Sequence, residues 1–176
     1  MPVKSPIRKM IVQKQGIIDL DGLYKVMYRW FYDNKYYFEE PTTRMRPGTP
    51  AGVEYEWKWS AWRKVSDFIK FHIKIFIHVW DAKEIEVIKD GEKIKLTKCR
   101  LKIEYDGGLE IDWTKKFDKS KFGNWLLNFY LVYILKEERI VANWWDELYY
   151  RVYKLQTICK EYLDMEAKGN AYYDIW

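Results

Sequence analysis

The chain has 176 residues, of which 48 % are hydrophobic and 32 % charged, a composition that excludes a disordered or collagen-like chain and suits one ordinary core. Aromatic residues make up 19 %, and these rings either fill the core or lie on the surface as anchors for a partner. The net charge of +5 permits an anionic partner such as nucleic acid but does not require one.

The N-terminal part of the chain is expected to be a basic arm followed by one helix. Residues 1–15 contain four lysines and arginines and no acid, with at most a short strand at 10–12. A helix capped by Asp19 or Asp21 should run to about Asn34, because apolar residues recur there at helical spacing. This apolar stripe consists of Leu20, Leu23, Met27, Trp30 and Phe31.

Strand patterns dominate the middle of the chain. After a short strand at 36–38, three prolines and two glycines predict a loop at 41–52. Residues 53–61 and 68–80 then alternate between apolar and polar side chains, which predicts a long hairpin with one buried face. The side chains expected to face inward are Val53, Tyr55, Trp57, Trp59 and Ala61, and then Ile69, Phe71, Ile73, Ile75, Ile77 and Val79.

A second hairpin is predicted around Asp90-Gly91, a residue pair typical of two-residue turns. Counting outward from this turn pairs Val87 with Ile94 and Ile85 with Leu96. These apolar pairs then share one face of the hairpin, which supports this register.

Two irregularities are expected farther along the sheet. The apolar parity slips at 97–98, which predicts a bulge there. Residues 99–105 should form a strand, and the Asp-Gly-Gly segment 106–108 should be a hairpin loop, because that length pairs Tyr105 with Leu109. The sheet is then an antiparallel meander of six strands, with five to seven as the range.

Two helices are expected to complete the chain. The first begins near 118–120 and is apolar on nearly every side as far as Leu135. The second runs from about Glu138 to Lys168 and ends at Gly169, a natural residue for the end of a helix. Its apolar residues form a heptad stripe, which favours packing of this long helix across the open face of the sheet.

These elements predict an α+β fold with a single domain at 16–168, between the basic arm and a C-terminal tail at 169–176. Cys99 and Cys159 both fall on positions expected to face inward. Buried free thiols, in a sequence without a recognisable signal peptide, favour a reducing, cytoplasmic setting.

The segment Lys121–Leu163 resembles the end of helix-grip proteins of the START and polyketide-cyclase superfamily. It has an apolar turn, a charged break at Lys136-Glu137-Glu138-Arg139 and a long amphipathic helix. The run Leu23–Phe31 and the turn Asp90–Lys93 are similar to small archaeal proteins of unassigned function. The resemblance implies a curved antiparallel sheet with the last helix lying across it, an apolar ligand between the two, and few enzymes among the members.

Two sets of residues are candidates for binding. One lines the interior between the sheet and the last helix and suits a small hydrophobic ligand, whereas the other alternates cations with rings and suits RNA or another partner. The interior set is Trp57, Trp59, Phe71, Ile73, Trp145, Leu148 and Val152. The surface set is Lys70, His72, Lys74, Phe76, Lys115, Lys116, Lys119 and Lys121.

No catalytic or nucleotide-binding motif is recognisable, so we expect neither enzymatic activity nor a cofactor. No metal site is expected, because His72 and His78 lie six residues apart on one strand, about 20 Å at the usual rise. The leading hypothesis is a binding domain for a hydrophobic ligand or a protein partner. An RNA- or ribonucleoprotein-associated factor and a self-assembling structural subunit, a homo-oligomer, are the alternatives. The apolar run at 122–135 is too short to cross a bilayer.

Overall fold

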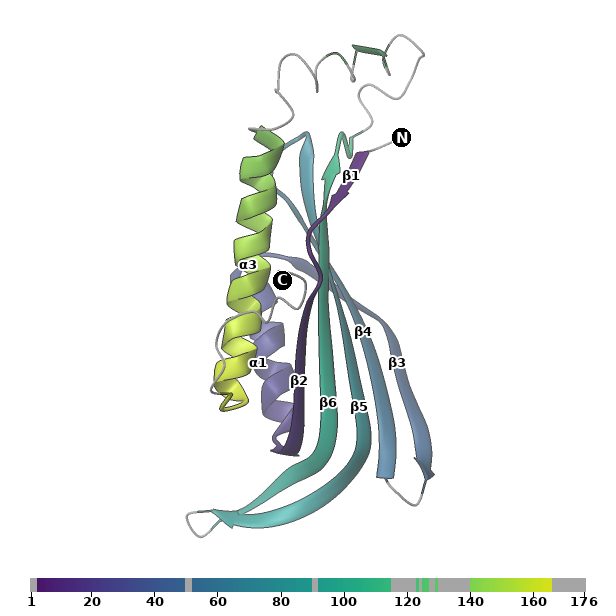
Figure 1. Cartoon of the computed structure of the whole chain (residues 1–176), viewed down its shortest axis with the longest axis vertical. Coiled ribbons are helices and arrows are strands. Elements are labelled where there is room, and N and C mark those ends of the chain that lie inside the picture. Colours follow the sequence, from purple (N-terminus) through teal and green to yellow (C-terminus); the bar gives the residue numbers. More distant parts are fainter. Residues whose placement is uncertain are drawn as a thin grey trace, which may run out of the picture.

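The computed structural model describes residues 3–49, 52–89, 92–114, 123, 125–126, 129 and 140–165. Within these residues, a curved six-stranded antiparallel sheet carries two helices on its concave face, which confirms the predicted α+β class and number of strands (Figure 1). The predicted helix before Leu135 lies mostly outside the described residues, and none of the described helices is long and apolar enough to cross a membrane. The helices are α1 (Leu20–Asp33) and α3 (Ile140–Tyr162), and the strands are β1 (Val3–Pro6), β2 (Met10–Ile18), β3 (Tyr37–Thr49), β4 (Gly52–Lys64), β5 (Ile69–Lys89) and β6 (Glu92–Ile111).

The sheet is a meander of β3, β4, β5 and β6, and β1 and β2 pair one after the other along the remaining side of β6. Most of the stretch predicted to be a basic arm, residues 1–15, therefore lies in the sheet. Met10 and Val12 face the core, while Ile11 between them is exposed. The short strand predicted at 10–12 is therefore confirmed, as the first part of the longer β2.

The loop predicted at 41–52 is a wrong assignment, because β3 continues through it to Thr49 as the other edge of the sheet. Pro41 and Pro47 each lie at a shift in the register between β3 and β4. An edge strand tolerates proline at such a bulge, since the missing N–H is not needed for a ladder hydrogen bond. Here the prolines mark an edge strand.

The strands β5 and β6 are 21 and 20 residues long, and their lower ends curve beneath the helices (Figure 1). The pairing predicted around Asp90-Gly91 is confirmed, including Ile85 opposite Leu96. The bulge predicted at 97–98 lies instead on β5, between Trp80 and Lys83. β6 keeps its register with β2 at 97–98, so this side of the strand has no bulge there.

The hairpin loop predicted at 106–108 is also wrong, since β6 runs straight through this segment. A Cβ atom on Gly107 would lie 2.9 Å from the Cδ1 atom of Ile7, and one on Gly108 would lie 3.2 Å from the carbonyl oxygen of Ser5. The Ile7 N–H also donates to the carbonyl oxygen of Gly107 at 2.8 Å. These glycines serve the close approach of the β1–β2 edge rather than a turn.

The predicted N-terminal helix is confirmed almost to the residue by α1. Asp19 is its N-cap, and one carboxylate oxygen accepts a hydrogen bond from the Gly22 N–H at 2.9 Å. Its buried residues belong to the predicted apolar stripe: Leu23, Met27, Trp30 and Phe31.

The end of α3 differs from the prediction, because the helix stops at Tyr162 rather than near Gly169. Asp164 has a φ of 49°, and its N–H donates to the carbonyl of Glu161 at 3.1 Å. The Met165 N–H donates to the carbonyl oxygen of Lys160 at 3.0 Å. This is a Schellman motif in which aspartate, whose short side chain tolerates the left-handed region, takes the usual place of glycine.

The helix α3 packs on β6 and β2, and its side chains also cover the β1–β2 edge. The indole Nε1 of Trp145 donates to the Pro6 carbonyl oxygen at 3.0 Å, and the Gln156 Nε2 donates to that of Ile11 at 3.5 Å. These contacts satisfy carbonyl groups that an open edge would leave to solvent. The fully buried residues of α3 include Leu148, Val152 and Leu155.

Gly22 lies where the start of α1 meets the end of α3, with no room for a side chain. The Tyr162 hydroxyl donates to Asp19 Oδ2 at 2.7 Å, and a Cβ atom on Gly22 would lie 1.8 Å from that hydroxyl oxygen. We expect Gly22→Ala to lower the free energy of unfolding by about 1–3 kcal/mol, although alanine normally stabilises a helix relative to glycine. A urea melt measures the change. The loss should shrink in a Tyr162→Ala background, and a Gly22→Ala protein more stable than the wild type would contradict the contact.

Candidate functional site

The interior set of candidate residues lies between the helices and the sheet, but its members do not all pack under α3, since the Trp59 ring contacts Tyr24 and Phe31 of α1. Five of the seven side chains are buried in one continuous core cluster, and the other two pack half-buried against it. The space between helix and sheet is therefore occupied by the protein's own side chains at these positions. The buried five are Trp59, Phe71, Ile73, Leu148 and Val152, and the half-buried two are Trp57 and Trp145.

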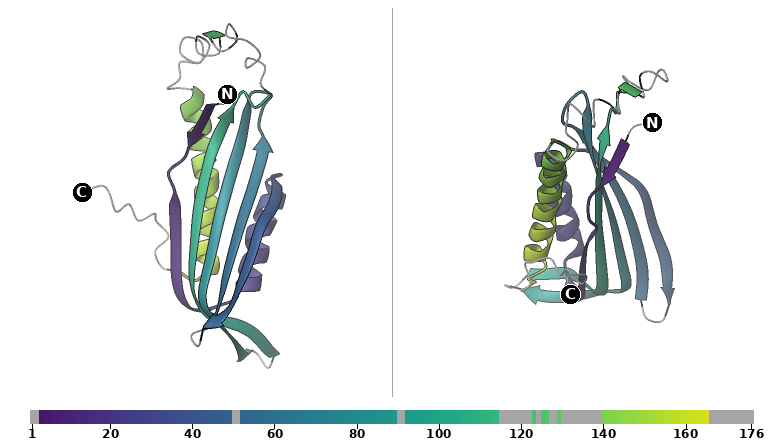
Figure 2. Two further views of the ribbon diagram at one scale, coloured as in Figure 1. Left: turned by 90° about the vertical axis from the view of Figure 1, so that its right-hand side faces the viewer. Right: turned by 45° about the horizontal axis from the view of Figure 1, so that its top comes forward.

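The described members of the surface set lie on β5, on the side of the sheet that carries neither α1 nor α3. This outer face of the sheet is turned to the viewer in Figure 2, left. These members alternate along β5 with buried residues, so their side chains share this face. The ammonium group of Lys70 also lies 4.3 Å from the centre of the Trp62 ring. The members on β5 are Lys70, His72, Lys74 and Phe76, whereas Lys115, Lys116, Lys119 and Lys121 lie outside the described residues.

Four depressions of the described residues follow one another along this outer face, and we call them together the outer groove. The two nearer β1 share Lys74 and Asp106 in their walls and have volumes of about 270 and 390 Å³. The two nearer the curved strand ends share Gln15 and Arg100 and have volumes of about 450 and 290 Å³. Gly108 lines the depression of about 270 Å³ and has no side chain, which leaves room between the flanking residues.

Cations outnumber acids in the walls of the outer groove, with seven lysines and arginines on this face against three acidic residues. Hydrogen bonds from Lys102 and Lys9, at 2.6 and 2.7 Å, lower the pKa of the Glu104 carboxyl group. The groove should therefore attract an anionic ligand. The cations are Lys9, Lys58, Lys74, Lys83, Lys98, Arg100 and Lys102, and the acids are Asp81, Glu104 and Asp106. Lys14 also lines one depression, but its ammonium group donates to the Leu163 carbonyl oxygen at the end of α3, on the other face of the sheet.

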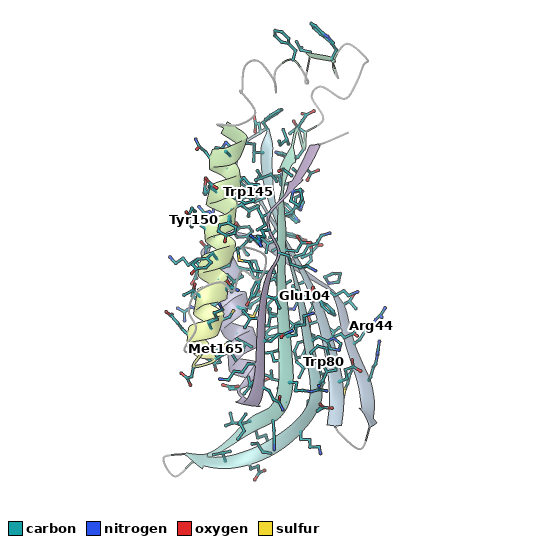
Figure 3. All side chains as sticks on the ribbon, viewed as in Figure 1. Arg44, Trp80, Glu104, Trp145, Tyr150 and Met165 are labelled. Carbon is teal, nitrogen blue, oxygen red and sulfur yellow. The ribbon has the colours of Figure 1, made fainter. Side chains whose placement is uncertain are left out.

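Rings in the outer groove lie next to cations. The Lys58 ammonium group is 5.8 Å from the centre of the Phe76 ring, and the Arg100 guanidinium carbon is 5.9 Å from that of Trp80. Figure 3 shows Trp80 and Glu104 on the same side of the sheet, away from α3. A ring beside a cation suits single-stranded nucleic acid, since a base stacks on the ring while the cation holds a phosphate.

Both histidines contact glutamates on a neighbouring strand. His72 Nε2 is 2.5 Å from Glu110 Oε2, and His78 Nε2 is 2.5 Å from Glu54 Oε1. Glu56 adds a carboxylate oxygen 3.9 Å from the same nitrogen of His78, so three potential metal ligands converge there. The Glu-Tyr-Glu spacing places both carboxylates on one strand face, but the register that brings His78 to them cannot be seen in the sequence.

The two cysteines are buried free thiols, as predicted. Burial raises the pKa of Cys99 to about 11 and that of Cys159 to about 12. Both thiols therefore stay protonated near neutral pH and are poor nucleophiles.

The chain matches no protein-family model and no curated protein sequence.

Proposed function

We propose that this chain is a non-enzymatic binding domain that holds single-stranded RNA along the outer groove. The observation that carries the proposal is the groove's lining, in which seven cations stand against three acids beside the rings of Phe76 and Trp80. Phosphates would lie against cations such as Lys58, Lys74 and Lys98, and bases would stack on the two rings. The two helices α1 and α3 lie on the concave face, so among the described residues no helix covers the outer face, which could take an extended ligand (Figure 2).

An apolar ligand in the interior is less well supported. The resemblance to helix-grip proteins would place such a ligand between α3 and the sheet. Phe71 and Leu148 are fully buried there and belong to one core cluster, so a ligand would have to displace packed side chains. The expected cytoplasmic setting fits the two buried thiols, Cys99 and Cys159, which need no oxidising environment.

A protein partner is the second candidate, favoured by exposed tyrosines near the β3 edge. Tyr28 and Tyr32 lie on α1 and Tyr37 begins β3, where its ring is 4.8 Å from that of Trp62. Exposed aromatic side chains are frequent anchors of protein interfaces. If the partner is a second copy of the chain, sedimentation velocity should show a dimer that Tyr32→Ser weakens. A concentration-independent monomer would rule out self-assembly.

Replacing lysines of the outer groove should weaken RNA binding more than replacing lysines elsewhere. Lys58→Gln/Lys74→Gln removes two exposed cations from the groove, and the matched control Lys25→Gln/Lys154→Gln removes two exposed cations from the helices. Fluorescence anisotropy with a labelled single-stranded RNA measures the association constant K at several salt concentrations. The decrease of log K with log salt should become less steep in the groove variant, by about 0.7 for each lost phosphate contact. The control should keep the wild-type slope and affinity.

Phe76→Leu provides a second measurement, because it keeps an apolar side chain but removes the flat ring. A stacked base would be lost at a cost of about 1–3 kcal/mol in binding free energy. Wild-type affinity in Lys58→Gln/Lys74→Gln would overturn the proposal. Equal weakening of the two lysine variants would also overturn it, since it would indicate attraction by net charge alone.

A further inference from the structure

Three potential metal ligands meet on the outer face of β4 and β5. His78 Nε2 lies 2.5 Å from Glu54 Oε1 and 3.9 Å from Glu56 Oε1, and the three ligand atoms all lie within 4.8 Å of one another. An imidazole nitrogen and two carboxylate oxygens are donor atoms that divalent transition-metal ions take from proteins.

The sheet positions these side chains in advance. Glu54 and Glu56 are two residues apart on β4 and so point to the same face, and the register puts Glu56 directly opposite His78. The side chains of Glu54, Glu56 and His78 are only 27, 12 and 15 % exposed. The centre of the Trp80 ring is 3.8 Å from that of His78, at an interplanar angle of 31°, which restricts rotation of the imidazole. Little freedom is therefore left to lose when an ion binds.

Arg46 of β3 supplies the positive charge that this cluster attracts. Its guanidinium nitrogens lie 3.6 Å from Glu54 and 3.4 Å from Glu56. The Arg46 side chain is 59 % exposed, so it can move into solvent at little cost. Arg44 stands opposite Glu56 in the pairing of β3 with β4 and adds a second cation on this side. Arginine and a metal ion would therefore compete for the same two carboxylates, and at Glu56 for the same oxygen, Oε1.

We propose that Glu54, Glu56 and His78 bind a divalent first-row transition-metal ion, for which Zn²⁺ is the probe, and that Arg46 moves aside when the ion enters. The imidazole favours such an ion over Mg²⁺ and Ca²⁺, which take oxygen ligands. Three protein ligands leave a coordination position that faces solvent, where water would bind. The site does not depend on RNA binding in the outer groove.

Isothermal titration calorimetry of the metal-free full chain with Zn²⁺ tests the proposal. We expect one ion to bind per chain, and binding to weaken at least about tenfold in His78→Gln and in Glu56→Gln. His72→Gln is the matched control, because His72 makes the same 2.5 Å contact on the same face but with a single carboxylate, that of Glu110. Its affinity for Zn²⁺ should equal that of the wild type. The chain has two histidines, His72 and His78, and both cysteines are buried, so few other side chains can compete for Zn²⁺.

Arg46→Gln separates a metal site from a simple ion-pair cluster. Removing the competing guanidinium should raise the affinity for Zn²⁺ severalfold, and Mg²⁺ should give no binding heat with any variant. With Co²⁺, the visible absorption bands should appear in the wild type and His72→Gln and be lost in His78→Gln. Undiminished binding in His78→Gln, equal loss in His72→Gln, or weaker binding in Arg46→Gln would overturn the proposal. Circular dichroism confirms that each variant compared is folded.

Discussion

Leu148→Ala is expected to lower the free energy of unfolding by about 2–5 kcal/mol, the range for truncation of a fully buried leucine. Leu148 has no exposed surface, and Val152, one turn later on the same side of α3, is equally buried. Truncation removes apolar contacts and leaves a cavity between α3 and the sheet, which the paired strands cannot readily close. Urea denaturation followed by circular dichroism measures the loss.

The control for this prediction lies on the same helix. Tyr150 is 67 % exposed and points away from the sheet (Figure 3). Tyr150→Ala removes more atoms than Leu148→Ala, yet it should change the free energy of unfolding by no more than about 0.5 kcal/mol. If the exposed substitution cost as much as the buried one, the face of α3 assigned to the core would be wrong.

Gly52→Ala is expected to cost about 1–3 kcal/mol through backbone strain, and more through a clash. Gly52 has a φ of +143°, which a residue with a Cβ atom rarely adopts. A Cβ atom there would lie 2.5 Å from the backbone carbonyl carbon of Asp81, in the bulge of β5. Backbone atoms of a paired strand cannot rotate aside as a side chain can. The free energy of unfolding from urea melts again measures the effect.

Gly16→Ala separates the two causes. Gly16 has nearly the same φ, +149°, but a Cβ atom there would meet nothing within 4 Å. Its substitution should therefore show the strain alone, and Gly52→Ala should cost measurably more. Equal losses at both positions would mean that the contact with Asp81 contributes nothing.

The elements that could be predicted are those whose signals are local. Asp19 lies next to the helix it caps, and the alternation along β5 needs only neighbouring residues. The errors at 41–52 and 106–108 share one physical cause, which is contact with a distant segment. Gly107 resembles part of a turn until Ile7 is seen packed against it, and Pro41 resembles a loop residue until β3 is seen to be an edge strand.

The candidate sites divide in the same way. Strand parity placed Lys74 and Phe76 on one face, and both line the outer groove. The groove also needs Lys9 and Lys102 from elements that the sequence does not show to be neighbours. The proposed metal ligands were not predicted at all, because His78 meets Glu56 through the register of β4 with β5.

By itself, the sequence determined the fold class, the extent of α1 and the side chains that share each face of β4 and β5. These properties follow from the helical and strand periods, which act over a few residues. Only the tertiary structure decided that β1 and β2 flank β6, where α3 ends, and which charges meet on the outer face. Strand order and register are set by packing between residues far apart in the chain, and no local pattern encodes those distances.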